Sequence, residues 1–180
     1  MRTARVVLLV CGVAVISCGS PMSTPSRDQL TASSSRALDS VVQATGNGKV
    51  RIDGELRTFA FTAVRHSNVP PEDFTATGEA QLFTRPFFIA HAEIICMKVM
   101  GNQAWIGGII TGHHFCSGTN FMFHVEDNGE RNGDPPDMLS LAAVCDAPGP
   151  ELPLAYCATG SAPYPLPEFP VEEGSIVVHQ

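Results

Sequence analysis

The fold is decided by the stretch Phe87–Thr111, which reads FFIAHAEIICMKVMGNQAWIGGIIT. Two runs rich in apolar and β-branched residues, Phe87–Met100 and Gln103–Thr111, flank the dipeptide Gly101-Asn102. Gly and Asn tolerate the positive φ angles that a tight connection between antiparallel strands needs. The stretch therefore predicts a β-hairpin, and Gly107-Gly108 inside the second run indicates a bulge or a bend in the sheet.

Further alternating runs extend the β pattern from Lys49 to the end of the chain. Turn-forming residues separate them, as in the segment Ser67–Asp73 with its two prolines. About eight short strands with almost no helix predict an all-β domain, built as a single antiparallel sandwich or barrel. The remaining strands are expected at Arg57–His66, Phe74–Phe83, Asn120–Val125, Met138–Cys145 and Ser175–His179.

The first residues of the chain have the character of a bacterial lipoprotein signal. Two arginines precede an apolar run from Val6 to Ile16, and Ser17-Cys18 follows it. Aliphatic residues, a small residue and a cysteine, in that order, mark the point where the chain is cut and Cys18 receives lipid. The apolar run has 11 residues, and a membrane-spanning helix needs roughly 20. An ordinary signal peptide cut one or two residues later is the alternative.

This interpretation divides the chain into three segments. Residues 1–17 form the signal peptide, residues 18–45 the lipidated cysteine with a flexible tether rich in Ser, Thr and Pro, and residues 46–180 one β domain. A short helical turn is expected at Ala37–Ala44, before Gly46-Asn47-Gly48 ends it. The mature protein is expected on the cell membrane, anchored by its acyl chains and facing outside the cytoplasm.

The charge of the chain excludes one class of partner. The full chain has 11 basic and 18 acidic residues, a net charge of −7, and loss of the two arginines of the signal peptide makes the mature chain more acidic. Such a surface repels phosphate backbones and anionic lipid head groups, so we expect no nucleic-acid binding. The expected partners are the membrane, through the lipid anchor, and an unidentified ligand or protein of the cell envelope.

Four cysteines are left for the folded domain, because Cys11 leaves with the signal peptide and Cys18 carries the lipid. An even number of cysteines in an exported chain predicts two disulfides. We expect one disulfide to tie the hairpin to the loop that follows it and the other to close a short proline-containing loop. Alternatively, the first of these cysteines, which lies inside an apolar strand, is a buried thiol. The expected pairs are Cys96 with Cys116 and Cys145 with Cys157.

The acidic segment Glu126–Asp137 raises the question of calcium. Its spacing does not match a helix–loop–helix calcium site, because the sixth position from Asp127 is Asn132 instead of Gly and the twelfth is Met138 instead of Glu. Two Asn-Gly pairs and Pro135-Pro136 indicate turns instead. Zinc-type spacing of Cys and His is absent as well, so no metal or cofactor is expected. The weak calcium candidates are Asp127, Glu130, Asp134 and Asp137.

No motif for nucleophilic catalysis is present, since the chain has no Gly-x-Ser-x-Gly, Ser-x-x-Lys or His-Glu-x-x-His sequence. We therefore predict no catalytic residue. Trp105, the single tryptophan, is a candidate sugar-stacking platform, but its apolar neighbours favour packing against the core. The segment Pro163–Pro170 either docks into a groove of a partner or forms an extended strap that delivers Ile176 and Val178 to the sheet. The strand-like end of the chain favours the strap.

Three segments of the chain combine into a further pattern: Ala92–Met97, Gly101–Gly108, and Phe123–Glu130 continued by Pro135–Asp137. With the turn motif V-x-D-N-G-E…P-P-D, this pattern resembles a group of exported bacterial all-β proteins that have no assigned activity. The resemblance covers about Gly46 to His179, and it implies an exported all-β domain without naming a catalytic residue. We therefore predict a non-catalytic binding or structural module of the cell envelope. The alternative is an envelope enzyme or a calcium-dependent binding protein.

Overall fold

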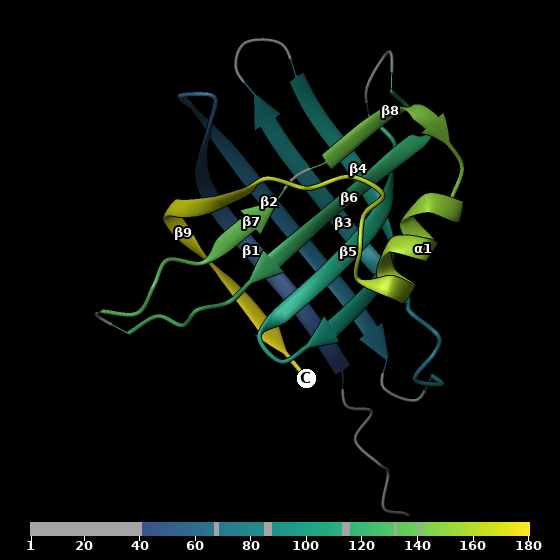
Figure 1. Ribbon diagram of the computed structural model, residues 1–180, viewed down its shortest axis with the longest axis horizontal. Helices are drawn as coiled ribbons and strands as arrows, with labels where there is room; N and C mark the ends of the chain where they lie inside the picture. Colours follow the sequence, from purple (N-terminus) through teal and green to yellow (C-terminus); the bar gives the residue numbers. More distant parts are fainter. Residues whose placement is uncertain (1–40, 67–68, 85–87, 113–115, 132, 141) are drawn as a thin grey trace, which may run out of the picture. The chain divides into compact units, whose positions relative to one another are not determined.

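Strands dominate the computed structural model, which describes residues 41–66, 69–84, 88–112, 116–131, 133–140 and 142–180 (Figure 1). The side chains of residues 84, 88–89 and 142–147 are not among those described. The described residues form nine strands and one helix, which are β1 Val41–Ile52, β2 Glu55–His66, β3 Thr75–Thr84, β4 Phe88–Met100, β5 Gln103–Ile110, β6 Thr119–Glu126, β7 Met138–Ser140, β8 Ala142–Pro148, α1 Glu151–Thr159 and β9 Glu168–His179.

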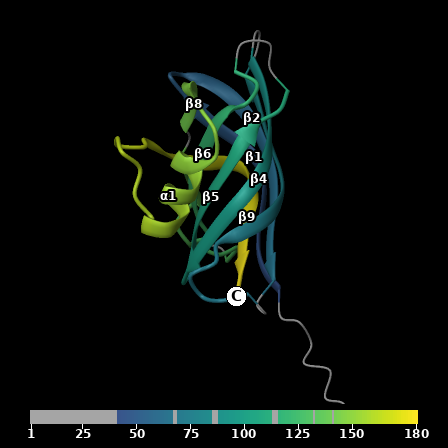
Figure 2. The same cartoon turned by 90° about the vertical axis from the view of Figure 1, so that its right-hand side faces the viewer.

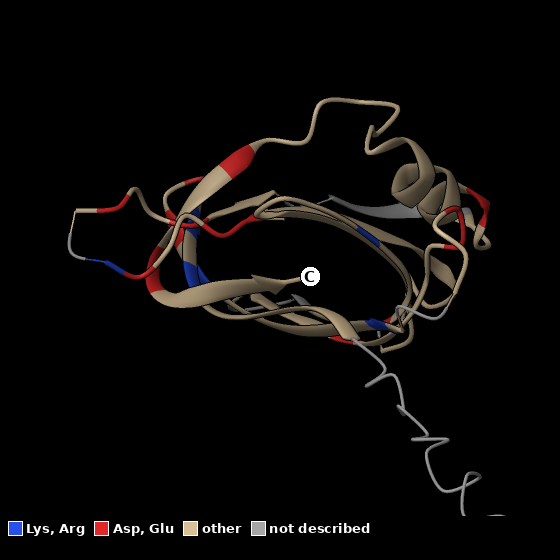
Figure 3. Ribbon diagram, turned by 90° about the horizontal axis from the view of Figure 1, so that it is seen from below, with Lys and Arg blue, Asp and Glu red and all other residues tan. Residues whose placement is uncertain are grey.

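The strands close into an antiparallel barrel. Neighbouring strands follow the order β5-β4-β3-β2-β1-β9-β7-β6, and the pairing of β5 with β6 completes an eight-stranded ring, seen from below in Figure 3. Strand β8 is additional and also pairs with β6. The predicted all-β fold is confirmed in its barrel form, in which the ring pairs its own edges.

The hairpin predicted at Phe87–Thr111 is the pair β4–β5. Met100 pairs with Gln103, and Gly101 has a φ of 63° in the turn between them. The expected bulge is also present, because Ile94 pairs with Gly108 and Cys96 with Gly107, which leaves Ile95 as an extra residue on β4. A one-residue bulge reverses the face on which the following side chains lie.

The inside of the barrel is a packed core. Phenylalanines from β2 and β6 meet there, with the ring centroids of Phe61 and Phe123 5.1 Å apart and those of Phe121 and Phe123 5.3 Å apart. A cavity among Phe59, these rings and Leu82 has a volume of only about 10 Å³. The interior is therefore filled by side chains, as is typical of small eight-stranded barrels.

The glycines of Gly46-Asn47-Gly48 lie in the middle of β1 and do not end a helix. Gly46 pairs with Phe61, and a Cβ on Gly46 would lie 2.5 Å from that ring, so the glycine makes room for the aromatic core. The helical turn expected at Ala37–Ala44 is wrong for residues 41–44, which are strand, and residues 37–40 lie outside the described part of the chain. Strand β1 begins before the expected domain start at residue 46.

The helix α1 was not predicted. It begins after Pro150 and ends at Gly160, whose φ of 70° lets its N–H bond to the carbonyl of Tyr156 at 2.8 Å. Figure 2 shows α1 on one side of the barrel, outside the wall of strands. Within the described ranges, no helix has both the length and the apolar character needed to cross a membrane.

A disulfide between Cys96 and Cys157 fastens α1 to β4. The expected pairing of Cys96 with Cys116 and Cys145 with Cys157 is therefore wrong. The bulge at Ile95 explains the error, because it turns Cys96 to the outer face of the barrel, under α1. Cys116 is buried and is also disulfide-bonded, while the side chain of Cys145 lies outside the described side chains.

The end of the chain forms the expected strap. Residues 160–167, which we call the strap from here on, connect α1 to β9 without regular structure, whereas residues 168–170 of the expected strap belong to β9. Strand β9 then pairs with β1, and it places Ile176 in the core with Val178 packed against it. Strand β9 starts at Glu168, earlier than the predicted Ser175.

Candidate functional site

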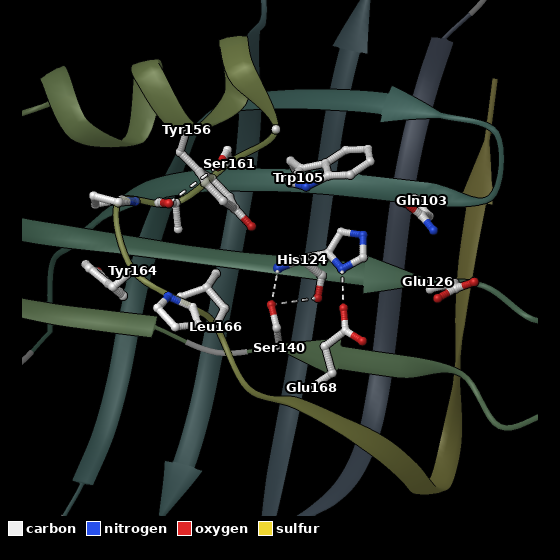
Figure 4. A pocket seen from close by; sticks show the side chains of 14 residues that line it. Gln103, Trp105, His124, Glu126, Ser140, Tyr156, Ser161, Tyr164, Leu166 and Glu168 are labelled. Carbon is white, nitrogen blue, oxygen red and sulfur yellow. Dashed lines mark hydrogen bonds and ion pairs between the residues drawn. The ribbon is translucent and has the colours of Figure 1, made fainter.

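A groove lies on the outer wall of the barrel, beneath α1 and the strap (Figure 4). Side chains alternate between the two faces of a strand, and Ala104, Ile106 and Val125 point into the core. Their neighbours Trp105 on β5 and His124 on β6 therefore point outward, into the groove.

The wall of the groove comes from α1, the strap and the first residue of β9. The volume of the groove is about 660 Å³, within the range of roughly 300 to 1,000 Å³ typical of ligand pockets. The residues that line it are Gln103, Trp105, His124, Glu126, Ser140, Tyr156, Gly160, Ser161, Ala162, Pro163, Tyr164, Pro165, Leu166 and Glu168.

The helix is held over the barrel by small residues as well as by the disulfide. A Cβ on Gly107 would lie 2.7 Å from the Sγ atom of Cys96 and 2.8 Å from the Cβ atom of Pro153, so only glycine at this position of β5 lets α1 approach so closely. At the end of the helix, Gly160 lies against the indole of Trp105. The groove therefore depends on the bulge, the disulfide and these two glycines.

His124 is the central polar residue of the groove floor. Its side chain is 12% exposed, and its Nδ1 atom lies 3.4 Å from the Oε1 atom of Glu168. Its ring packs against Trp105 with centroids 4.8 Å apart. Burial lowers the pKa of His124, and the carboxylates of Glu168 and Glu126 offset this lowering only in part. The imidazole is thus neutral at pH 7.

The carboxylate of Glu168 decides where the proton of the neutral imidazole resides. We assign the proton to Nδ1, because that nitrogen faces the carboxylate. The Nε2 atom of His124 is then a hydrogen-bond acceptor, and it is buried without a partner in the described part of the protein.

Tyr156 of α1 contributes a second buried polar atom. The residue is 2% exposed, its hydroxyl has no hydrogen-bond partner among the described residues, and Figure 4 shows the hydroxyl directed toward the groove floor. Burial raises the pKa of Tyr156, and a weak hydrogen-bonding interaction with the side chain of Ser140, whose geometry falls short of a full hydrogen bond, lowers it in part. The phenol therefore keeps its proton at neutral pH and is a potential donor.

The hydroxyl of Ser140 is already engaged. Its Oγ atom accepts the backbone N–H of His124 at 2.9 Å and donates to the carbonyl of the same residue at 3.4 Å. Ser140 thus holds β7 against β6 in place of a regular ladder bond. A serine used in this way is poorly placed to act as a nucleophile, because no base activates it.

The charge of the groove is acidic. Glu126 and Glu168 contribute carboxylates, and none of the lining residues within the described chain is Lys or Arg. Anionic ligands are therefore disfavoured, because two carboxylates face them without a compensating cation. Neutral polar and aromatic contacts make up the rest of the lining.

No family model, curated protein or solved structure matches this chain. Its site is therefore interpreted from its own geometry.

The acidic segment Glu126–Asp137 has a structural role that explains its sequence. Asp137 is 7% exposed, and its carboxylate accepts the backbone N–H groups of Asn128 at 2.8 Å and Ile176 at 2.7 Å. The carboxylate of Asp127 accepts those of Gly129 at 3.0 Å and Val178 at 2.9 Å. We call these two aspartates the carboxylate clasp.

The clasp takes the place of a neighbouring strand. Strand β7 pairs with β9 only from Glu168 to Pro170, so the amides of Ile176 and Val178 need other acceptors. The two carboxylates supply them and thereby complete the barrel wall beside β9.

The calcium candidates do not form a cation site in the described residues. No group of three or more His, Cys, Asp or Glu side chains there is arranged to hold a metal ion. Asp134 accepts the backbone N–H of Arg131 at 2.9 Å within the exposed turn, and Glu130 is exposed. The interpretation of the segment as a series of turns thus agrees with the hydrogen bonds of Asp127, Asp134 and Asp137.

Trp105 does not pack in the core, contrary to expectation. It lies on the outer face of β5 because Ala104 and Ile106, its two neighbours, occupy the inner face. His124, Tyr156 and Glu168, which also line the groove, were not predicted as site residues. Their outward position follows only from the strand pairing. Cys18, the predicted lipidation site, lies outside the described residues.

A second hollow lies over strands β1, β2 and β3. Its volume is about 510 Å³. Its polar side chains include Asn47, Thr62, Glu79 and Gln81, and no tryptophan or tyrosine lines it. This hollow provides matched control positions for tests of the groove.

Proposed function

We propose that this protein is a lipid-anchored binding module of the cell envelope, which takes a small ligand into the outer groove. The observation that carries the proposal is the combination of a filled barrel with a groove of about 660 Å³ on its outer wall. Aromatic residues and a few converging polar groups are the typical lining of a ligand site. The lipoprotein-type signal before Cys18 supports the location, outside the cytoplasm and held by acyl chains.

A binding role is favoured over catalysis by the state of the groove residues. The hydroxyl of Ser140 is occupied by the backbone of β6, and burial raises the pKa of Tyr156, which keeps its phenol protonated. His124 pairs with Glu168, but no activated nucleophile stands beside this pair in the described residues. An envelope enzyme remains the second candidate, because a His–Glu pair is also found in general-base catalysis.

The anchor is tested by the intact mass of the protein extracted from membranes. We expect a mass equal to residues 18–180 plus acyl chains, and the variant Cys18→Ala should lose the acyl chains and leave the membrane fraction. An unlipidated native chain in the secreted fraction would overturn the proposed location.

The groove is tested by a thermal-shift experiment with the full-length protein in detergent. The probe is the low-molecular-mass fraction of the envelope of the producing cell, and a ligand in it should raise the Tm by mass action. The variant Ser161→Phe, which places a ring at the exposed edge of the groove, should abolish the shift. Its control is Thr58→Phe on β2, which is also exposed but does not line the groove. The absence of a shift, or an equal shift in both variants, would contradict a binding role for the groove.

A further inference from the structure

Two buried atoms of the groove lack a partner, and they have complementary hydrogen-bonding roles. The hydroxyl of Tyr156 is available as a donor and the Nε2 atom of His124 as an acceptor. An unpartnered buried polar group lowers stability, so its persistence in a groove points to a ligand that supplies the missing bonds. A hydroxyl group can do both, because it donates one hydrogen bond and accepts others.

We infer that the ligand of the groove is a neutral carbohydrate, bound by hydroxyl contacts to Tyr156, His124, Gln103 and Glu126 beside the ring of Trp105. The inference rests on the proposed function of the groove and specifies its ligand.

Gln103 and Glu126 provide a second donor–acceptor pair. They are direct cross-strand partners on β5 and β6, so their side chains lie next to each other on the outer face. Both line the groove. An amide beside a carboxylate suits neighbouring hydroxyls of a sugar, one of which accepts while the other donates.

Aromatic rings provide the apolar part of the contact. Trp105 lines the floor, and Tyr164 of the strap, which is 37% exposed, also lines the groove. The face of an aromatic ring carries a partial negative charge, which attracts the weakly positive C–H groups of a sugar ring.

Charge argues against anionic ligands, and the hydrogen-bond donors of the groove argue against organic cations. Two carboxylates line the groove, and none of its lining residues in the described chain is Lys or Arg, which disfavours acidic sugars and phosphates. An organic cation without hydroxyl groups would leave the buried Tyr156 hydroxyl and the Gln103 amide group without an acceptor.

Both unpartnered atoms are buried, so a ligand that bonds to them must displace the groups that cover them. The hydrogen bonds of Ser161 are local, from its N–H to Thr159 at 3.2 Å and from its hydroxyl to Ala162 at 3.5 Å.

The test is a binding titration of the full-length protein in detergent with maltotriose, cellotriose and N,N′,N″-triacetylchitotriose, followed by calorimetry and by the fluorescence of Trp105. At least one trisaccharide should bind saturably. The variant Tyr156→Phe should weaken binding about tenfold, the effect of one lost hydrogen bond. Gln103→Ala should weaken it several-fold, and Gln81→Ala, an equally half-buried glutamine in the second hollow, should leave it unchanged.

Three results would overturn the inference. The first is that none of the three trisaccharides binds at 20 mM, a concentration of roughly the weakest dissociation constant of interest. The second is that Gln103→Ala and Gln81→Ala weaken binding equally. The third is that tetramethylammonium or glucuronate binds more tightly than any trisaccharide. If the trisaccharides fail while the envelope fraction still raises the Tm in a Ser161-dependent way, the ligand class alone is wrong. If both fail, the proposed function of the groove falls with it.

Discussion

Replacing Asp137 by alanine should destabilise the protein strongly, because the carboxylate clasp completes the barrel wall at β9. Asp137 is 7% exposed, and its carboxylate accepts two backbone N–H groups, from Asn128 at 2.8 Å and from Ile176 at 2.7 Å. A hydrogen bond to a charged group contributes about 1.5 to 3 kcal/mol, so Asp137→Ala should lower the free energy of unfolding by about 3 to 5 kcal/mol. This is a large part of the 5 to 15 kcal/mol that is roughly typical of a domain.

Urea denaturation followed by far-UV circular dichroism measures this loss. We expect the midpoint to fall by about 1.5 to 3 M, given a slope of roughly 1.5 to 2 kcal/mol/M for a chain of this size. The variant Asp137→Asn should lie in between, since it keeps one oxygen but places an amide opposite a backbone N–H. The control is Asp134→Ala in the same turn, which loses one exposed contact to Arg131 and should change stability by no more than about 0.5 kcal/mol.

If Asp137→Ala and Asp134→Ala unfold at the same urea concentration, the carboxylate clasp does not stabilise the barrel as we expect. A different result would restore the calcium interpretation. If calcium raised the midpoint of the wild-type protein but not of Asp137→Ala, the carboxylate would be a cation ligand. We expect neither calcium nor EDTA to move either midpoint.

Three further predictions concern the groove. Tyr156→Phe should leave stability unchanged or raise it by up to about 1 kcal/mol in urea denaturation, because it removes an unpartnered buried hydroxyl; a loss of more than about 1 kcal/mol would reveal a structural partner such as Ser140. Cys157→Ser should cost about 2 to 5 kcal/mol and shift the emission of Trp105 to the red, since it releases α1 from β4; unchanged emission would mean that the helix stays in place without the disulfide. Burial lowers the pKa of His124, although Glu168 and Glu126 face it, so the unfolded chain binds a proton first and stability should fall as the pH drops from about 7 to 5.5. In the variant His124→Gln, the urea midpoint should no longer fall over this pH range. A midpoint that falls as steeply as in the wild-type protein would contradict the lowered pKa of His124.

The sequence predicted local features of the fold well. The alternation of Phe87–Thr111 and the turn at Gly101-Asn102 specify the hairpin β4–β5, because the two strands of a hairpin are close together in the sequence. The strap and the burial of Ile176 were predicted from an apolar end after a proline-rich segment, and the structure agrees.

Other features depended on contacts between distant parts of the chain. The extra residue Ile95 turned Cys96 outward, which no alternation pattern reveals, and so the disulfide pairing was wrong. Helix α1 was not predicted, because Pro150 and Pro153 indicated a loop. Proline is nevertheless common at the start of a helix and glycine just after its end, as Pro150 and Gly160 are here.

The groove itself could not be predicted from the sequence. Its residues run from Gln103 to Glu168 and meet only because the barrel closes through β5, β6, β7 and β9. The alternation of residues along a strand would place Trp105 and His124 on the outer face. For Trp105, however, the apolar neighbours in the sequence favoured packing against the core. The lipoprotein signal and Cys18 remain predictions that the membrane-extraction experiment will test.

The most direct test of the groove as a binding site is a heteronuclear NMR titration of the isotope-labelled full-length protein in detergent with the three trisaccharides. Trp105 is the only tryptophan, so its indole N–H gives a single resolved signal inside the groove. We expect that signal to shift saturably, together with the amides of Gln103, His124, Glu126 and the strap. An unmoved indole signal, or shifts confined to the hollow over β1, β2 and β3, would contradict the account.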